Sequence, residues 1–358
     1  SVLEGKALEG SSLREGTALA FGSEPKALLC VPEVSRALDP VALDAYLDLY
    51  YVPPPCSMFA GIRQLPPGHV LVWQDGAIEI RRCWDAEPAV IEGRSLEEWA
   101  EIVQPVLEDA ILSHTISDVP LGAFLSGGVD SSTIVAVLSE HGHGPVETFC
   151  VGYGNEGKSY DERAEARAVA AFFGTRHHEL ELGIDVLSGL EAMVRGFDEP
   201  FGSPTAMLSW ALSRFVRQHV TVALAGDGGD ELFGGYPRYR GLRLSELASH
   251  VPRPLLALAE RAAQGREEAT ARSYRRWARQ FLAGLRLEPA ERYGAWVAYA
   301  RLPERDRLLS PALRERLRAS ARANPVAEAF DRPAHGGSGP PIGLVERGAY
   351  ADLHGFLP

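Results

Sequence analysis

A glycine-rich loop constrains this chain more than any other feature of its sequence. The loop spans residues 126–132 (SGGVDSS), between an apolar run at 122–125 and a helix expected over 132–138. Glycines let a backbone approach a ligand closely, and a helix start offers unpaired N–H groups and the positive end of a dipole. The sequence therefore predicts an anion cradle at the carboxyl end of a strand, although a serine-capped turn without a ligand is the alternative.

Four side chains of this loop can contribute to the cradle. Ser126, Ser131 and Ser132 add hydroxyl donors, and Asp130 adds a carboxylate. A carboxylate beside bound phosphates requires a bridging cation, and Mg²⁺ prefers carboxylate and phosphate oxygens. We therefore expect a magnesium–phosphate site at this loop.

Strand, turn and helix signals alternate from about residue 121 to residue 230. Further strands are expected at 147–151 and 220–225, and a helix at 161–173. This alternation is typical of an α/β fold, in which a parallel sheet carries helices on both faces. The chain after Tyr236 is expected to be mostly helical.

A second acidic cluster spans residues 226–236 (GDGGDELFGGY), directly after the strand expected at 220–225. In a parallel sheet, ligands gather at the carboxyl ends of the strands. Both clusters should then face one crevice, and the carboxylates of the second cluster suit either a metal ion or a charged substrate. An ordinary turn is the alternative for 226–236 alone.

The segment before the sheet has signals of its own. Residues 70–80 indicate a hairpin, because Asp75-Gly76 supplies the positive φ that a tight turn needs. Ser95 and Glu98 indicate a capping box. The helix that follows has apolar residues at helical spacing (Trp99, Ile102, Val106 and Ala110), with Pro105 inside it. Residues 53–55 are three prolines, which we expect to link two domains.

Two other patterns suggest rival chemistry. Residues 152–159 match the Walker A pattern, and Asp227 could act as its acidic partner, so a P-loop NTPase is an alternative. That interpretation leaves the loop 126–132 unexplained. His177 and His178 suggest a metal site, but neighbours on a strand point to opposite faces. We therefore interpret this pair as structural.

Composition limits the partners. Of the 358 residues, 46% are hydrophobic and 23% are charged, and the net charge of −12 argues against nucleic acid as the main partner. We expect no membrane span and a cytoplasmic protein, since no apolar run is long enough. The four cysteines form no metal or disulfide pattern. The Arg-rich segment 263–322 is expected to be a solvated helical face rather than a tRNA or partner surface.

The chain also resembles a known family. Residues 126–132 are similar to the PP-loop of ATP pyrophosphatases. An ordered set of motifs resembles glutamine-dependent asparagine synthetases, which are class II amidotransferases. The motifs lie at 21–28 (FGSEPKAL), 61–68 (GIRQLPPG), 117–122 (SDVPLG), 160–162 (YDE), 198–200 (DEP) and 226–236.

The resemblance implies an adenine nucleotide α-hydrolase-like fold, ATP and Mg²⁺ as cofactors, and a set of site residues. Aspartate would attack ATP to give an acyl-adenylate and pyrophosphate, and ammonia would then release asparagine and AMP. The metal would be held by Asp130 and Asp230, while Asp227 and Asp230 would be catalytic. ATP and its pyrophosphate would contact Leu125, Ser126, Gly127, Gly128, Asp130, Ser131, Ser132, Val151, Ala225 and Gly226.

The resemblance also predicts how the chain is divided. Residues 1–90 would be the C-terminal remnant of a β-rich glutaminase-like domain plus linker, and 91–358 the ATP-pyrophosphatase domain. The chain would then be truncated at both ends, with no glutaminase nucleophile assigned and a homodimer possible. The alternatives are a PP-loop amidotransferase or cyclase acting on another carboxylate, and a nucleotide-binding fragment without turnover.

Overall fold

The computed structural model divides the chain into two compact units. The first comprises residues 91–196 and 203–229, and the second comprises 1–90, 197–202 and 230–358, so the chain passes between the units four times. We call them the sheet unit and the helical unit. The structure describes residues 18–88, 91, 93–142, 144–152, 161–182, 186–203, 205–248, 251–263, 274–299, 307–319, 325–332 and 342–357.

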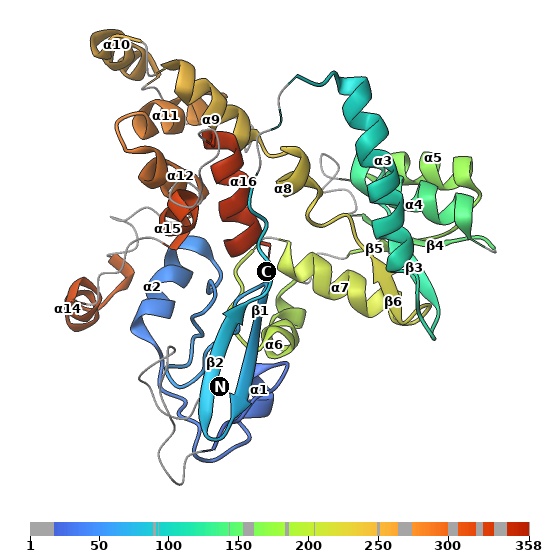
Figure 1. Cartoon of the computed structure of the whole chain (residues 1–358), viewed down its shortest axis with the longest axis horizontal. Helices are drawn as coiled ribbons and strands as arrows, with labels where there is room; N and C mark the ends of the chain where they lie inside the picture. The colour runs from blue at the N-terminus through green and yellow to red at the C-terminus, as the bar shows by residue number, and fades with distance from the viewer. Residues whose placement is uncertain are drawn as a thin grey trace. The chain divides into compact units, whose positions relative to one another are not determined.

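The sheet unit contains a parallel sheet of four strands in the order β5-β4-β3-β6, which confirms the predicted α/β fold (Figure 1). The order places β3 between β4 and β6, so the loop after β3 leaves the middle of the sheet. The strands are β3 (Leu121–Phe124), β4 (Glu147–Gly152), β5 (Arg176–Glu181) and β6 (Val222–Leu224).

Helices cover both faces of this sheet because successive strand residues point to opposite sides. Cys150 packs with α4 and α5 on one face, while Phe149 packs with Val216 of α7 on the other. Burying apolar side chains on two faces explains why β3 (LGAF) and β6 (VAL) read as apolar runs rather than alternating ones. The helices of this unit are α3 (Leu96–Ser113), α4 (Val129–His141), α5 (Arg163–Phe173), α6 (Val186–Phe197) and α7 (Ala206–Val216).

Helix α3 begins at the predicted capping box. The Ser95 hydroxyl accepts from the Glu98 N–H at 3.2 Å, and the Glu98 carboxylate accepts from the Ser95 N–H at 2.7 Å. The predicted helix is present, but not all of the apolar residues that indicated it are buried, since Ile102 and Val106 are 40% and 67% exposed. The core is met by the stripe that contains Ile111. Helix α3 thus has two rows of apolar residues. The row that contains Ile102 and Val106 faces outward, and the row that contains Ile111 faces the core.

The predicted hairpin is confirmed in the helical unit. Strands β1 (His69–Gln74) and β2 (Ala77–Arg82) pair antiparallel, with Gln74 opposite Ala77. Asp75 and Gly76 between them have φ values of 52° and 75°. These values are those of a tight turn whose twist matches the strands.

The three prolines at 53–55 do not link two domains, which corrects the sequence-based interpretation. They lie within the helical unit, and the Pro54–Pro55 peptide bond is cis. Val52 and Cys56 on either side are 8% and 9% exposed and pack in one core cluster. Proline rigidity therefore shapes a buried turn here rather than a linker.

The described residues after Tyr236 are mostly helical, as predicted. Its core gathers Tyr239, Leu242, Tyr293 and Phe330, each at most 2% exposed. The helices of this unit are α1 (Pro25–Leu28), α2 (Pro40–Leu49), α9 (Pro237–Ala248), α10 (Arg253–Ala263), α11 (Tyr274–Gly284), α12 (Pro289–Val297), α14 (Pro311–Ala319), α15 (Pro325–Asp331) and α16 (Leu344–Gly355). No helix in the described part of the chain is long and apolar enough to cross a membrane.

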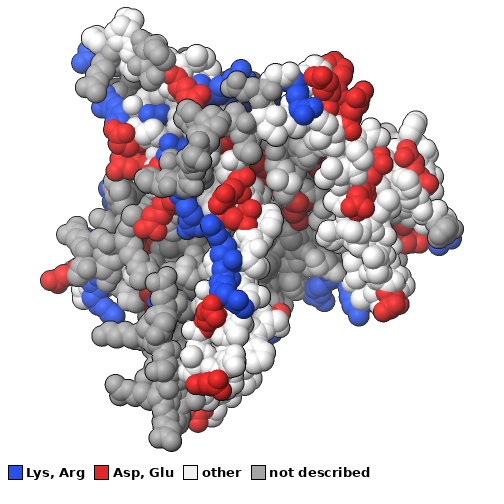
Figure 2. Space-filling view, viewed as in Figure 1, with Lys and Arg blue, Asp and Glu red and all other residues white. Residues whose placement is uncertain are grey.

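One arginine of the Arg-rich segment is not on a solvated face. Arg292 is 9% exposed, and its guanidinium donates to the Gly284 and Leu287 carbonyls and to the Ser245 hydroxyl. It therefore satisfies carbonyl groups at the end of α11, which would otherwise lack partners. Elsewhere on the visible face, basic side chains lie beside acidic ones (Figure 2).

Candidate active site

The loop 126–132 leaves the carboxyl end of β3 and enters α4, as the sequence predicts. Helix α4 begins at Val129 with Gly128 as its N-cap, and no side chain caps its start. The first N–H groups of a helix have no partner within the helix. With thirteen residues in α4, these N–H groups and the helix dipole offer an anion site open at the end of the sheet.

The serines hold the loop in shape. The Ser126 and Ser131 hydroxyls are 3.0 Å apart, and the Ser131 hydroxyl also accepts from the Ser126 N–H at 3.2 Å. The Ser126 hydroxyl accepts from the Gly128 N–H at 3.2 Å. Ser131 is 8% exposed, so its first role is to fix the turn. The buried Ser132 hydroxyl has no hydrogen-bond partner among the described residues.

Gly127 allows α5 to pack directly on the loop. Its φ of 82° lies in the left-handed region that favours glycine. A Cβ at this position would lie 2.5 Å from the Glu165 Cβ and 2.8 Å from the Ala166 nitrogen. Any larger residue would therefore separate the loop from the helix behind it.

Asp130 joins this loop to the second acidic cluster. A Cβ on Gly229 would lie 2.7 Å from the Asp130 Cγ, and one on Gly226 would lie 3.0 Å from the Asp130 Cβ. Within the turn, the Gly229 N–H donates to the Gly226 carbonyl at 3.3 Å, and Gly228 has a φ of 92°. The ends of β3 and β6 thus bring the Asp130 side chain against the 226–229 turn.

The charges of Asp130, Asp227 and Asp230 are not neutralised by ion pairs within the described ranges. Among the described residues, none of Asp130, Asp227 and Asp230 forms an ion pair with Lys, Arg or His. A cation therefore fits the charge of the site. In the described ranges, no group of three His, Cys, Asp or Glu side chains could hold a metal by itself. A bound ion would need phosphate oxygens as well, which suits Mg²⁺.

The predicted adenine contacts lie around the same strand ends. Leu125 is 1% exposed, and its N–H donates to the Phe149 carbonyl at 2.8 Å. Val151 is half-buried near the end of β4, and Ala225 follows the end of β6. These three residues therefore end neighbouring strands, although their contact with a nucleotide stays a prediction.

Asp230 is the second residue of α8 (Gly229–Phe233) and the first residue of the last segment of the helical unit, 230–358. Its backbone carbonyl accepts from the Gly235 N–H at 3.0 Å, which closes the end of α8. Asp227 is exposed in the turn before it. The ion shared by Asp130 and Asp230 and the catalytic roles of Asp227 and Asp230 stay predictions.

The Walker A alternative lies mostly outside the described residues, which include Gly152 but not 153–160. Helix α5 begins at Arg163, with Glu162 as a non-helical N-cap. In a P-loop, the Lys-Ser pair sits at the start of the helix that cradles the phosphates. Lys158 and Ser159 lie outside the described residues, so whether they take that position stays a prediction.

His177 and His178 have separate partners, as residues on opposite faces of β5. His177 Nδ1 lies 3.0 Å from the Thr148 hydroxyl, while His178 Nε2 lies 2.6 Å from Glu147. The His178 ring also stacks on Phe149, with centroids 5.1 Å apart. Each ring is thus part of the packing of the sheet.

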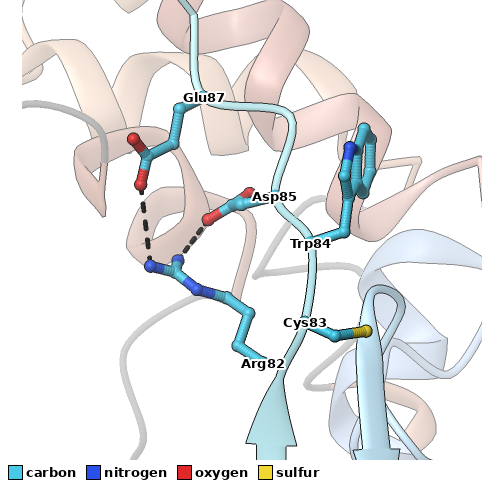
Figure 3. A pocket seen from close by; sticks show the side chains of 5 residues that line it. All are labelled: Arg82, Cys83, Trp84, Asp85 and Glu87. Atoms are coloured by element: carbon cyan, nitrogen blue, oxygen red, sulfur yellow. Dashed lines mark hydrogen bonds and ion pairs between the residues drawn. The ribbon is translucent and has the colours of Figure 1, made fainter.

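A separate open cavity of about 310 Å³ lies at the end of β2 in the helical unit. Figure 3 shows the Arg82 guanidinium turned toward Asp85 and Glu87, while the Cys83 and Trp84 side chains point away from it. Arg82 forms ion pairs with both carboxylates. The charges of this cavity are therefore satisfied internally, and the strand ends remain the stronger candidate site.

Sequence reasoning gave no role to the residues that fasten the 197–202 segment to the rest of the helical unit. Asp198, with a φ of 63°, accepts from the Lys26 N–H at 2.9 Å and from its ammonium at 3.1 Å. Glu199 accepts from the Met58 N–H at 3.0 Å and from the buried Ser57 hydroxyl. The family-like motifs at 21–28 and 198–200 were the available signal, but a motif does not say what it contacts.

Comparison with known proteins agrees with this architecture. The fold and the loop 126–132 define a parallel α/β domain of the PP-loop type. The sequence model of asparagine synthase matches residues 103–340, which is more than half of the chain, and that of the glutamine amidotransferase domain matches 11–84. The chain belongs to the asparagine synthase family.

Curated relatives support the same assignment. The chain is 35% identical over 237 residues to a putative glutamine-hydrolysing asparagine synthetase 2 of Methanocaldococcus jannaschii, covering 62% of this chain and 44% of the relative. It is 34% identical over 222 residues to asparagine synthetase 1 of Bacillus subtilis, covering 62% and 34%. For asparagine synthetase 3 of Arabidopsis thaliana the values are 32% over 187 residues, 48% and 31%. The chain thus spans less than half the length of these relatives.

Proposed function

We propose that this chain is an ATP-dependent ligase that converts aspartate and ammonia to asparagine, with AMP and pyrophosphate as the other products. The observation that carries the proposal is the position of Asp130 against Gly226 and Gly229. It unites the glycine loop after β3 with the acidic turn after β6. Family membership, at 30–35% identity to named asparagine synthetases, supports the choice of reaction.

The phosphates of ATP would lie on the loop 126–132. The first N–H groups of α4 and the helix dipole attract them without any side chain having to move. The Ser132 hydroxyl, buried and without a partner in the described ranges, would gain one from a phosphate oxygen. A buried hydroxyl left unsatisfied costs about 1–3 kcal/mol, so this contact would stabilise the bound state.

Asp130 and Asp230 would hold Mg²⁺ together with phosphate oxygens. The ion supplies positive charge that offsets the repulsion between carboxylates and triphosphate and that stabilises the departing pyrophosphate. Neither aspartate forms an ion pair among the residues that the structure describes, which supports this role. Asp227, exposed in the same turn, would lie near the reacting carboxylate.

The proposed reaction has two steps, adenylation of the aspartate carboxylate and attack by ammonia. The aspartate side-chain oxygen attacks the α-phosphorus, so a new P–O bond forms and the bond to pyrophosphate breaks. Ammonia then attacks the acyl carbon, loses a proton, and the C–O bond to AMP breaks. The protein's part is to align the carboxylate with the α-phosphorus, since placing two reactants in the right geometry lowers the barrier by several kcal/mol.

An exchange assay tests this proposal. Radiolabelled pyrophosphate is added to the chain with Mg-ATP and a panel of carboxylic amino acids, with free ammonia omitted. We expect label in ATP only with aspartate, and none in the Asp130→Asn variant. Exchange with a different acid alone would assign the chain to another amide-forming reaction, and ATP binding without exchange would refute catalysis by this chain.

A further inference from the structure

The carboxylate of Asp230 lies directly over the backbone of Gly235. A Cβ on Gly235 would overlap the Asp230 Oδ1 and would lie 2.9 Å from its Cγ and 3.3 Å from its Cα. We infer that Gly235 is a positioning residue for Asp230, because its missing side chain leaves the space in which the carboxylate lies. The inference rests on the proposed function, in which Asp230 holds the metal.

The turn after α8 brings these two residues together. Gly234 has a φ of 71°, a left-handed conformation that ends the helix. The next N–H, from Gly235, donates to the Asp230 carbonyl at 3.0 Å. Asp230 therefore meets Gly235 through both its carbonyl and its carboxylate, and the direction of the carboxylate depends on this turn.

The residues around the turn hold it in place. The Tyr236 hydroxyl donates at 2.9 Å to Glu231, which is 2% exposed. Partial burial, together with this hydrogen bond, raises the pKa of Tyr236, so the phenol stays a donor. The hydrogen bond between Tyr236 and Glu231 thus joins the residues on either side of the turn that contains Gly235.

A second anchor fastens the same segment to α16. The Arg238 guanidinium lies 3.6 Å from the centre of the Tyr236 ring and donates to Asp352 at 2.8 Å. Asp352 is 3% exposed and also accepts from the Tyr239 and Tyr293 hydroxyls, at 2.6 and 2.5 Å. The Asp352 carboxylate is buried and accepts from three side chains, so it holds Arg238, and with it the segment after Gly235, in position.

An added methyl group at position 235 would therefore displace the carboxylate rather than the backbone. The carboxylate is the free end of a flexible side chain, while the turn is held on both sides. The φ of Gly235 is outside the left-handed region, so alanine is compatible with the backbone there. Because Mg²⁺ demands near-ideal ligand positions, displacement of Asp230 should weaken metal binding while the fold persists.

The test measures Mn²⁺ binding by electron paramagnetic resonance, with α,β-methylene-ATP present, and urea unfolding of the same samples. The variants are Gly235→Ala, Asp230→Ala, their double variant and Gly144→Ala, whose added methyl would meet nothing within 4 Å. Gly235→Ala should weaken Mn²⁺ binding on the order of tenfold or more, the scale of lost outer-shell support. Gly144→Ala should match the wild type, and the double variant should bind like Asp230→Ala alone.

The outcomes separate this inference from the proposed function. Wild-type Mn²⁺ binding in Gly235→Ala, with weakened binding in Asp230→Ala, overturns the role of Gly235 alone. Unchanged binding in Asp230→Ala overturns the metal assignment of the proposed function. If Gly235→Ala fails to fold, rescue of folding by Asp230→Ala supports the contact, and failure of both variants to fold overturns it.

Discussion

The Asp130 carboxylate occupies the space beside Gly229, where a side chain would lie 2.7 Å from its Cγ. Asp130 lies in the first turn of α4, which follows β3, and Gly229 begins α8, which follows β6, almost a hundred positions further along the chain. This relationship brings the glycine loop and the acidic turn into one site of the sheet unit. The following predictions depend on that site and on the packing that supports it.

Gly127→Ala should destabilise the sheet unit more than Gly174→Ala. Both glycines have left-handed φ values, 82° and 66°, so both substitutions carry backbone strain of about 1–2 kcal/mol. Only at Gly127 would the new methyl also collide with Glu165, which adds overpacking of about 1–3 kcal/mol. Urea unfolding of both variants measures the difference, and equal free energies of unfolding would show that α5 does not pack on the loop.

Asp130→Asn should nearly abolish Mg-ATP binding or adenylation, whereas Lys158→Ala should leave ATP binding almost intact. The reason is that Asp130 lies in the proposed phosphate site, while Lys158 belongs to the Walker A pattern at 152–159. Calorimetric titration of both variants with Mg-ATP measures this. The P-loop NTPase interpretation would be correct if Lys158→Ala lost binding and Asp130→Asn kept it.

The free energy of unfolding should fall as the pH drops below about 6.5, in part because of His177. Burial lowers the pKa of His177, an effect that the nearby Glu179 opposes and that His178 and Arg167 reinforce. The unfolded state therefore binds this proton more readily than the folded state, so stability is retained above pH 6.5 and lost below it. His177→Gln should flatten urea-derived stabilities between pH 8 and 5, and an unchanged slope would contradict the prediction.

The parallel sheet, the hairpin and the capping box were predictable because each depends on residues close in sequence. Asp75-Gly76 specifies its turn wherever it occurs, and Ser95 and Glu98 cap each other. Which apolar side chains of α3 are buried could not be predicted from nearby residues, because it depends on the face of the helix that packs on the sheet. The packing of residues 53–55 within one unit could not be predicted for the same reason, since three prolines occur both in linkers and in packed turns.

The candidate site was predictable only in part. The rule that parallel strands end at one edge was enough to bring Asp130 near the 226–229 turn. The contact of Arg238 with Asp352 could not be predicted, since it depends on a helix more than a hundred residues away. The contact of Gly235 with Asp230 is local, but residue type and spacing do not show where the turn directs the carboxylate. Spacing and residue type do not reveal which buried carboxylate supports which turn.

Asp230→Asn should lower the adenylation rate by roughly a hundredfold or more, the scale of losing one transition-state stabiliser. ATP affinity should fall much less, because the N–H groups at the start of α4 still bind the phosphates. Rapid-quench measurement of AMP formation, beside a titration with Mg-ATP, separates the two effects. Equal losses of rate and affinity would instead place Asp230 in nucleotide docking.

The central claim is that a substrate carboxylate attacks the α-phosphorus of ATP held at the loop 126–132. The most direct measurement supplies aspartate labelled with ¹⁸O in its side-chain carboxylate, together with Mg-ATP and ammonia, and analyses the products by mass spectrometry. The account predicts one ¹⁸O atom in AMP, none in pyrophosphate, and no ADP. Formation of ADP with ¹⁸O in inorganic phosphate would contradict it, since the carboxylate would then have attacked the γ-phosphorus.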